Sequence, residues 1–77
     1  MSEEKTFYIG KYQAYRYFCR ENHLDLQRHI HISRPEQMLG LSRENKILRV
    51  GPIEGWFEIE KKLRVMGYQA ADAEGKE

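Results

Sequence analysis

Three short runs of β-branched and aromatic residues each lead into a stretch with helical periodicity, and this order constrains the fold more than any other feature. The runs are Thr6–Ile9, Gln27–Ile32 and Lys46–Val50. The helical stretches that follow them are Lys11–Asn22, a short segment that begins near Pro35, and Ile53–Met66. Strands that alternate with helices favour a parallel sheet with right-handed crossovers. We therefore predict an α/β domain with a three-stranded parallel sheet and helices on both faces.

The apolar content of the strands predicts their order. The first strand contains the uninterrupted run FYI, which is typical of a central parallel strand that is buried on both faces. In the second strand His29 and His31 alternate with isoleucines, which indicates one wet face or an edge position. We therefore expect the order 2-1-3. The order 1-2-3 would place the histidines in the centre, where they fit poorly.

The length of 77 residues allows a single domain. We predict a disordered tail over residues 1–5, the α/β domain over residues 6–69, and a second disordered tail over residues 70–77, where polar and small residues prevail. The single cysteine excludes an internal disulfide and favours a reducing compartment. Without a long apolar run or a signal sequence, the chain is expected to be cytoplasmic.

Several residues mark where helices begin and end. Ser33 and Glu36 have the spacing of a capping box, and Gly40 suits a left-handed stop after the short helix. The last helix places its core residues on one stripe, and acidic residues precede basic ones along it. Phe57 and Val65 lie off that stripe, which hints at self-association or at docking of a partner.

The carboxyl ends of the strands are the predicted ligand edge, because open parallel sheets bind ligands where the strand order reverses. Each of the three turns at this edge leads into a helix N-terminus, where free N–H groups favour an anion. We hypothesise a weak phosphate or sulfate site there. Its residues would be Gly10, Lys11, Ser33, Arg34 and Gly51.

The Gly10-Lys11 turn invites comparison with nucleotide-binding loops. Such a loop needs the pattern GxxxxGK followed by Ser or Thr, so that consecutive N–H groups surround the phosphates. Here a single glycine precedes Lys11, Tyr12 stands where Ser or Thr would hold magnesium, and the dinucleotide pattern GxGxxG is absent. A tight turn that lets the helix lie close to its strand is the favoured interpretation.

The five tyrosines have three interpretations. They can cap a small core with their hydroxyls in water. They can anchor a protein interface, where tyrosine and arginine are enriched. With neighbouring arginines, Tyr12 and Tyr17 can also form a stacking platform for single-stranded nucleic acid. The candidate interaction residues are Tyr12, Arg16, Tyr17, Arg20, Phe57 and Val65.

Charge gives the nucleic-acid interpretation limited support. The formal net charge is +1, but residues 5–70 hold twelve Lys or Arg against seven Asp or Glu. A domain with this excess of positive charge attracts a polyanion weakly, and dedicated nucleic-acid modules carry denser basic stripes. A solvated surface is the simpler interpretation.

Motifs for metal binding and catalysis are weak. His29 and His31 share one face of a strand, but neither His23 nor Cys19 completes a zinc spacing, so edge histidines are the better interpretation. Cys19 is expected to be a small buried hydrophobe. We find no catalytic constellation, and predict no metal, no cofactor and no enzymatic activity.

The segments YIGKYQAYRY, IHISRPEQMLGL and WFEIEKKLRVMG resemble small uncharacterised α/β proteins encoded by bacteriophages of actinobacteria. The likeness covers roughly residues 6–68 and includes no functional signature. It implies a phage accessory protein that acts in the host cytoplasm, and it transfers no site residues.

Together these observations predict a binding module that engages a protein, either itself or a host factor. The alternative is weak nucleic-acid or nucleotide-phosphate binding at the carboxyl edge of the sheet.

Overall fold

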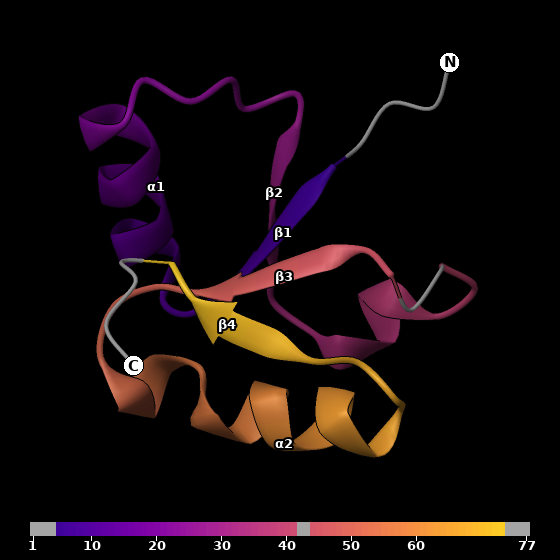
Figure 1. Cartoon of the computed structure of the whole chain (residues 1–77). Helices are drawn as coiled ribbons and strands as arrows, with labels where there is room; N and C mark the ends of the chain where they lie inside the picture. The colour runs from indigo at the N-terminus through magenta and orange to yellow at the C-terminus, as the bar shows by residue number, and fades with distance from the viewer. Residues whose placement is uncertain (1–4, 42–43, 74–77) are drawn as a thin grey trace.

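The structure, a computed structural model, describes residues 5–41 and 44–73 as strands alternating with helical segments (Figure 1). In chain order the elements are β1 (Thr6–Ile9), α1 (Tyr12–Glu21), β2 (His29–Ile32), the 3-10 helix η1 (Pro35–Met38), β3 (Lys46–Arg49), the 3-10 helix η2 (Ile53–Gly55), α2 (Phe57–Val65) and β4 (Ala70–Asp72).

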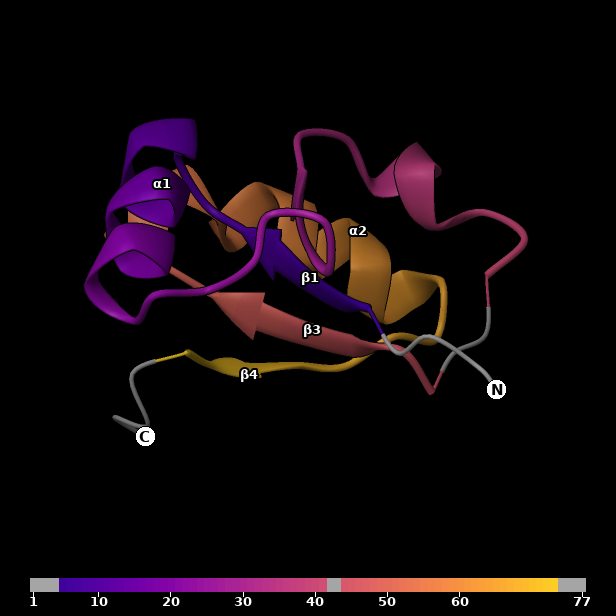
Figure 2. The ribbon, with the colours of Figure 1, turned by 90° about the horizontal axis from the view of Figure 1, so that it is seen from above.

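The strands form one parallel sheet in the order β2-β1-β3-β4. The central position of β1 beside both β2 and β3 confirms the predicted arrangement of the first three strands. Tyr8 pairs with His31 on one side and with Leu48 on the other. Seen from above, β1 crosses in front of α2, and β3 and β4 follow in turn to one side (Figure 2).

The prediction of three strands is wrong, because a fourth strand extends the sheet beyond β3. Ala70 pairs with Ile47, and Asp72 pairs with Arg49. These residues belong to the predicted carboxyl-terminal tail over residues 70–77. Residues 74–77 of that tail, and residues 1–4 of the predicted amino-terminal tail, lie outside the described residues. Gly67, at φ 100°, turns the chain after α2, and the buried ring of Tyr68 anchors the approach to β4.

Two cores lie on opposite faces of the sheet, so helical segments cover both faces as predicted. On one face α2 and η1 pack over Phe7, Ile9 and Ile47. On the other face α1 packs over Tyr8 and Val50 through its buried residues Tyr15 and Cys19. Figure 1 shows α1 and α2 on opposite sides of the strands.

The last helix differs from the prediction in its first turn. Instead of one helix over Ile53–Met66, the 3-10 helix η2 is followed by a break at Trp56, where φ is −132°, before α2 begins. The break directs the indole so that Trp56 Nε1 donates to the Gly51 carbonyl at 3.2 Å. The predicted core stripe is confirmed, since Leu63 is buried and Ile59 and Met66 pack beside it.

Candidate functional site

The carboxyl edge between β1 and β3 is closed by a close backbone approach. Gly10 follows β1 with φ 141°, and a Cβ on it would lie 2.2 Å from the Val50 carbonyl oxygen. Gly51 follows β3, where a Cβ would lie 2.7 Å from Ala14 Cβ on α1. These contacts agree with the interpretation of the Gly10-Lys11 turn as a device for close packing.

The amino end of α1 is covered by η2. A Cβ on Gly55 would lie 3.0 Å from the Lys11 backbone nitrogen and 2.9 Å from its Cγ. An anion that approached the Lys11 N–H from this side would therefore meet the backbone of η2. The Lys11 side chain itself is exposed.

The turn after β2 has its donors engaged by a side chain of η1. Gln37 Oε1 accepts from Ser33 N at 2.7 Å, from Ser33 Oγ at 3.2 Å and from Arg34 N at 2.8 Å. The predicted capping box of Ser33 with Glu36 is wrong, because Gln37, and not Glu36, makes these hydrogen bonds with Ser33. The carboxamide oxygen takes the place that a phosphate oxygen would need, so the hypothesis of an anion site finds no support at Ser33 and Arg34.

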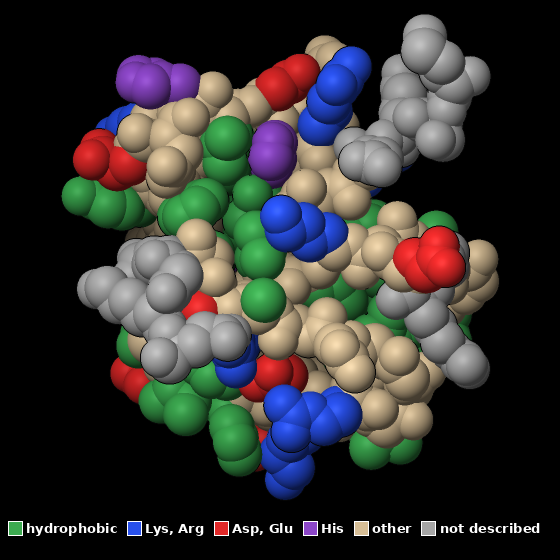
Figure 3. Space-filling model, viewed as in Figure 1, with side chains coloured by type: hydrophobic (Ala, Val, Ile, Leu, Met, Phe, Trp, Pro, Cys, Tyr) green, Lys and Arg blue, Asp and Glu red, His purple; other side chains and the backbone are tan. Residues whose placement is uncertain are grey.

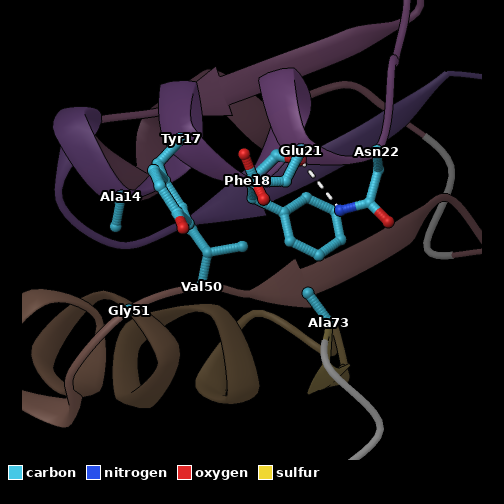
Figure 4. Close-up of a pocket in the computed structure, with 8 residues that line it drawn as sticks. All are labelled: Ala14, Tyr17, Phe18, Glu21, Asn22, Val50, Gly51 and Ala73. Atoms are coloured by element: carbon cyan, nitrogen blue, oxygen red, sulfur yellow. Dashed lines mark hydrogen bonds between the residues drawn. The ribbon is translucent and has the colours of Figure 1, made fainter.

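A groove lies beside this edge, between α1 and the carboxyl ends of β3 and β4 (Figure 4). Its volume is about 530 Å³, and its lining residues are Ala14, Tyr17, Phe18, Glu21, Asn22, Val50, Gly51 and Ala73. Of the predicted anion-site residues it contains Gly51 alone. Its walls are mainly apolar and aromatic, and Glu21 contributes a carboxylate. This lining suits an apolar group better than an anion.

The predicted interaction residues fall on two opposite sides of the sheet. Tyr12, Arg16, Tyr17 and Arg20 belong to the exposed part of α1, whereas Phe57 and Val65 belong to α2. Arg16 Nη1 donates to the Tyr12 hydroxyl at 3.1 Å, and its guanidinium lies 5.7 Å from the centre of the Tyr12 ring. The hydrogen bond to Tyr12 raises the pKa of Arg16. The six residues therefore form two surfaces rather than one.

The histidines of β2 belong to an aromatic cluster under α1. Tyr8 OH and His29 Nδ1 are 2.8 Å apart, and the Tyr15 hydroxyl donates to the His29 carbonyl. His31 Nε2 lies 2.6 Å from the Gly10 carbonyl oxygen, which only accepts, so this nitrogen carries the hydrogen. Both histidines are half-buried on the edge strand. The edge position was predicted from the alternation of HIHI, but the tyrosine partners were not.

The titratable groups buried beneath α1 favour their neutral forms. Burial, with a smaller contribution from Cys19, raises the pKa of Tyr8 from its ordinary value to about 12. Burial likewise raises the pKa of Tyr15 to about 12. Burial also raises the pKa of the free Cys19 thiol. A neutral, buried thiol fits the predicted role of Cys19 as a small hydrophobe and disfavours a nucleophile.

The outer face of α2 and the preceding η2 expose apolar side chains. Val65 is 89 % exposed, Phe57 is 45 % exposed, and Ile53 in the preceding turn is 56 % exposed. Lys61 lies between Phe57 and Val65, and its Nζ is 5.6 Å from the centre of the Phe57 ring. The lower edge of the space-filling view, where α2 lies, exposes hydrophobic, acidic and basic side chains next to one another (Figure 3).

The described residues contain neither a cluster of metal ligands nor a helix that could span a membrane. Within residues 5–41 and 44–73, no three His, Cys, Asp or Glu residues gather where they could hold a metal ion. In the same part of the chain no helix has the length and apolar character needed to cross a lipid bilayer.

Comparisons of the chain with protein-family models, with curated proteins and with solved structures find no match. The resemblance to small phage proteins stays a prediction.

Proposed function

We propose that this protein is a protein-interaction module that pairs with a second copy of itself through the outer face of α2. The observation that carries the proposal is the exposure of Phe57 and Val65 on the side of α2 away from its packed residues, together with exposed Ile53 in the preceding η2. Large apolar side chains that are exposed near one another are typical of interaction surfaces, whereas singly scattered ones are not.

These side chains are not needed for the core. α2 stabilises the fold through Leu63, which is 1 % exposed, and through Ile59 and Met66 beside it. Within α2, Phe57 and Val65 are two helical turns apart, with Lys61 between them. An apolar pair at this spacing suits packing against another helix.

The charge pattern of the same face favours a second copy of the chain as the partner. Glu54 and Glu58 lie in the first part of the segment, and Lys61, Lys62 and Arg64 lie in the second. Two copies of α2 that pack antiparallel would place the acidic part of each beside the basic part of the other. A two-fold axis between them gives a closed dimer, which is the commonest symmetry of oligomers.

The size of the surface limits the strength of this association. A single pair of short helices buries less than the roughly 1,200 Å² that is typical of stable complexes. The dimer is therefore expected to be weak and to depend on protein concentration.

Light scattering after size exclusion, over protein concentrations from micromolar to millimolar, tests the proposal. The mean mass should rise with concentration, and Phe57→Ser and Val65→Ser should each reduce the rise. Tyr17→Ser is the matched control, because Tyr17 is 65 % exposed on α1 at the opposite side of the sheet. A monomer mass at every concentration, or an equal effect of Tyr17→Ser, would contradict the proposal.

Binding of nucleic acid or nucleotide phosphate at the carboxyl edge is not proposed as a second function. The backbone donors of Ser33 and Arg34 are bonded to Gln37, and η2 covers Lys11 N.

A further inference from the structure

A cleft lies between α1 and the segment that leads from α1 to β2, and we call it the basic cleft. Its lining residues are Arg16, Cys19, Arg20, His23, Leu24 and Leu26. Its volume is about 300 Å³, which is at the lower end of the range for small-molecule pockets. It is separate from the outer face of α2, so binding in the cleft does not depend on the proposed dimer.

The rim of the basic cleft carries positive charge. Arg16 and Arg20 are one helical turn apart, and both are exposed. His23 adds an imidazole, and none of the described residues that line the cleft is acidic. Tyr12 holds Arg16 through a hydrogen bond of 3.1 Å and a contact between ring and guanidinium. An arginine that is already oriented loses less side-chain entropy when it binds an anion.

The end of α1 does not repel an anion as strongly as a bare helix C-terminus would. The Phe18 carbonyl accepts from the backbone N–H of Asn22 at 3.1 Å and from its Nδ2 at 2.9 Å. The Cys19 carbonyl accepts from the Leu24 N–H at 2.9 Å, and the Arg20 carbonyl accepts from the His23 N–H at 3.3 Å. The carbonyl groups nearest the cleft are therefore bonded inside the protein.

His23 ends the last turn of α1 in a left-handed conformation. His23 has φ 54°, the left-handed conformation that glycine adopts without cost and that other residues adopt at a cost of free energy. A histidine at this position places an imidazole among the residues that line the cleft.

Apolar side chains also line the basic cleft. Leu24 is half-buried against the core beneath α1, and Leu26 is 51 % exposed. The buried Cys19 thiol is neutral at pH 7, because burial raises its pKa, so it adds no negative charge to the cleft. Cationic groups beside apolar side chains are complementary to a molecule with an anionic head and a short apolar tail.

We propose that the basic cleft binds a soluble phosphate monoester that carries a short apolar group. Two guanidinium groups and an imidazole match a phosphate monoester better than a carboxylate, because the phosphate offers three acceptor oxygens and up to two negative charges, against two oxygens and one charge on a carboxylate. Leu24 and Leu26 contact the apolar group. The open cleft and small ligand predict a dissociation constant on the order of 10⁻⁴ to 10⁻³ M.

A titration followed by ¹⁵N–¹H correlation spectra tests this proposal with three probes at low ionic strength. Hexyl phosphate carries head and tail, methyl phosphate carries the head alone, and hexanol carries the tail alone. Hexyl phosphate should shift the amide signals of His23, Leu24 and Leu26 and bind at least about fivefold more tightly than either other probe. Equal affinities for hexyl and methyl phosphate would overturn the proposal.

Two double variants distinguish binding of hexyl phosphate in the basic cleft from general electrostatic attraction to the protein. Arg16→Gln with Arg20→Gln should weaken hexyl phosphate binding about tenfold or more, whereas Lys61→Gln with Lys62→Gln removes the same charge from α2 and should leave it unchanged. Leu26→Ser should weaken hexyl phosphate but not methyl phosphate. Equal losses in the two double variants would show that net charge alone attracts the probe and would overturn the site.

A phosphate ester on a membrane presents the same head group. Vesicles that contain phosphatidic acid distinguish this source in a sedimentation assay. Capture by these vesicles without any response to hexyl phosphate would overturn the proposal of a soluble ligand.

Discussion

Glu60 on α2 and Arg49 on β3 form an ion pair across the interface between helix and sheet, with Glu60 Oε2 3.3 Å from Arg49 Nη1. The same carboxylate oxygen lies 3.2 Å from Arg64 Nη2. Glu60 is 6 % exposed, and the Arg49 guanidinium also lies 4.9 Å from the centre of the Trp56 ring. This cluster ties α2 to one position along β3.

We expect Glu60→Gln to lower the free energy of unfolding by about 1–3 kcal/mol, because a charge-assisted bond to a partly buried arginine becomes a neutral one. Urea denaturation measures the change. Glu58→Gln is the matched control, since Glu58 is exposed on the same helix and should change stability by less than about 0.5 kcal/mol. Equal effects of the two variants would show that the buried pair has no special role.

Gly10→Ala should be among the most destabilising single-methyl changes in the protein. The added Cβ would lie 2.2 Å from the Val50 carbonyl oxygen, and the residue sits at φ 141°. We expect a loss above about 3 kcal/mol or failure to fold, since backbone strain and a clash act together.

Gly40→Ala separates the two causes. Gly40 has φ 82°, and a Cβ there would meet no atom of the described residues within 4 Å, so the variant carries backbone strain alone and should lose about 1 kcal/mol. Thermal denaturation of both variants gives the comparison. A Gly10→Ala protein as stable as Gly40→Ala would show that β1 and β3 can move apart at this edge.

The central part of the sheet could be predicted from the sequence because its signals are local and strong. The run FYI is apolar on both faces, so it could lie only in the middle, and the alternation of HIHI placed β2 at an edge. The stripe of apolar residues that includes Leu63 predicted which side of α2 is buried. These patterns depend on periodicity alone.

The features that were missed depend on tertiary contacts. The Ala-Ala-Asp sequence of β4 has little intrinsic strand preference, and pairing with β3 makes it a strand. Gln37 and Glu36 are both able to reach back to Ser33, and the 3-10 geometry of η1 favours the former. The clefts on either side of α1 are formed by segments that are distant or irregular in the sequence, so no spacing rule indicates them.

Tyr68→Phe should lower the free energy of unfolding by about 1–2 kcal/mol, because it removes a buried hydroxyl whose proton is shared between two backbone carbonyl oxygens. Tyr68 OH lies 2.6 Å from the Met38 carbonyl oxygen and 2.8 Å from that of Leu41, so it holds the end of η1 against the start of β4. Tyr17→Phe removes an exposed hydroxyl and is the control for urea denaturation. Hydrogen exchange at Gly40 and Leu41 should rise in the Tyr68 variant alone; protection equal to the unmodified protein would contradict this role.

Stability should fall between pH 10 and pH 12 through Tyr8 and Tyr15. Their pKa values rise from 10.0 in the unfolded chain to about 12 in the folded protein, so the folded state binds more protons in this range. Their contribution is fully present below pH 10 and is lost as pH rises through 12. Urea denaturation as a function of pH measures the slope. The double variant Tyr8→Phe with Tyr15→Phe should have a shallower slope over this range, and an unchanged slope would assign the alkaline loss to other groups.

The antiparallel pairing proposed for α2 predicts a dimer that responds to charge. Lower salt should strengthen association of the unmodified protein, because the acidic part of each α2 faces the basic part of the other. The variant Glu54→Lys with Glu58→Lys carries a wholly basic outer face and should stay monomeric, and Lys61→Glu with Lys62→Glu carries an acidic one and should do the same. A mixture of the two variants should form dimers, which sedimentation velocity detects with one variant labelled. Parallel pairing would instead place Glu54 and Glu58 beside their own copies, so association that weakens at low salt would exclude the antiparallel arrangement even if a dimer forms.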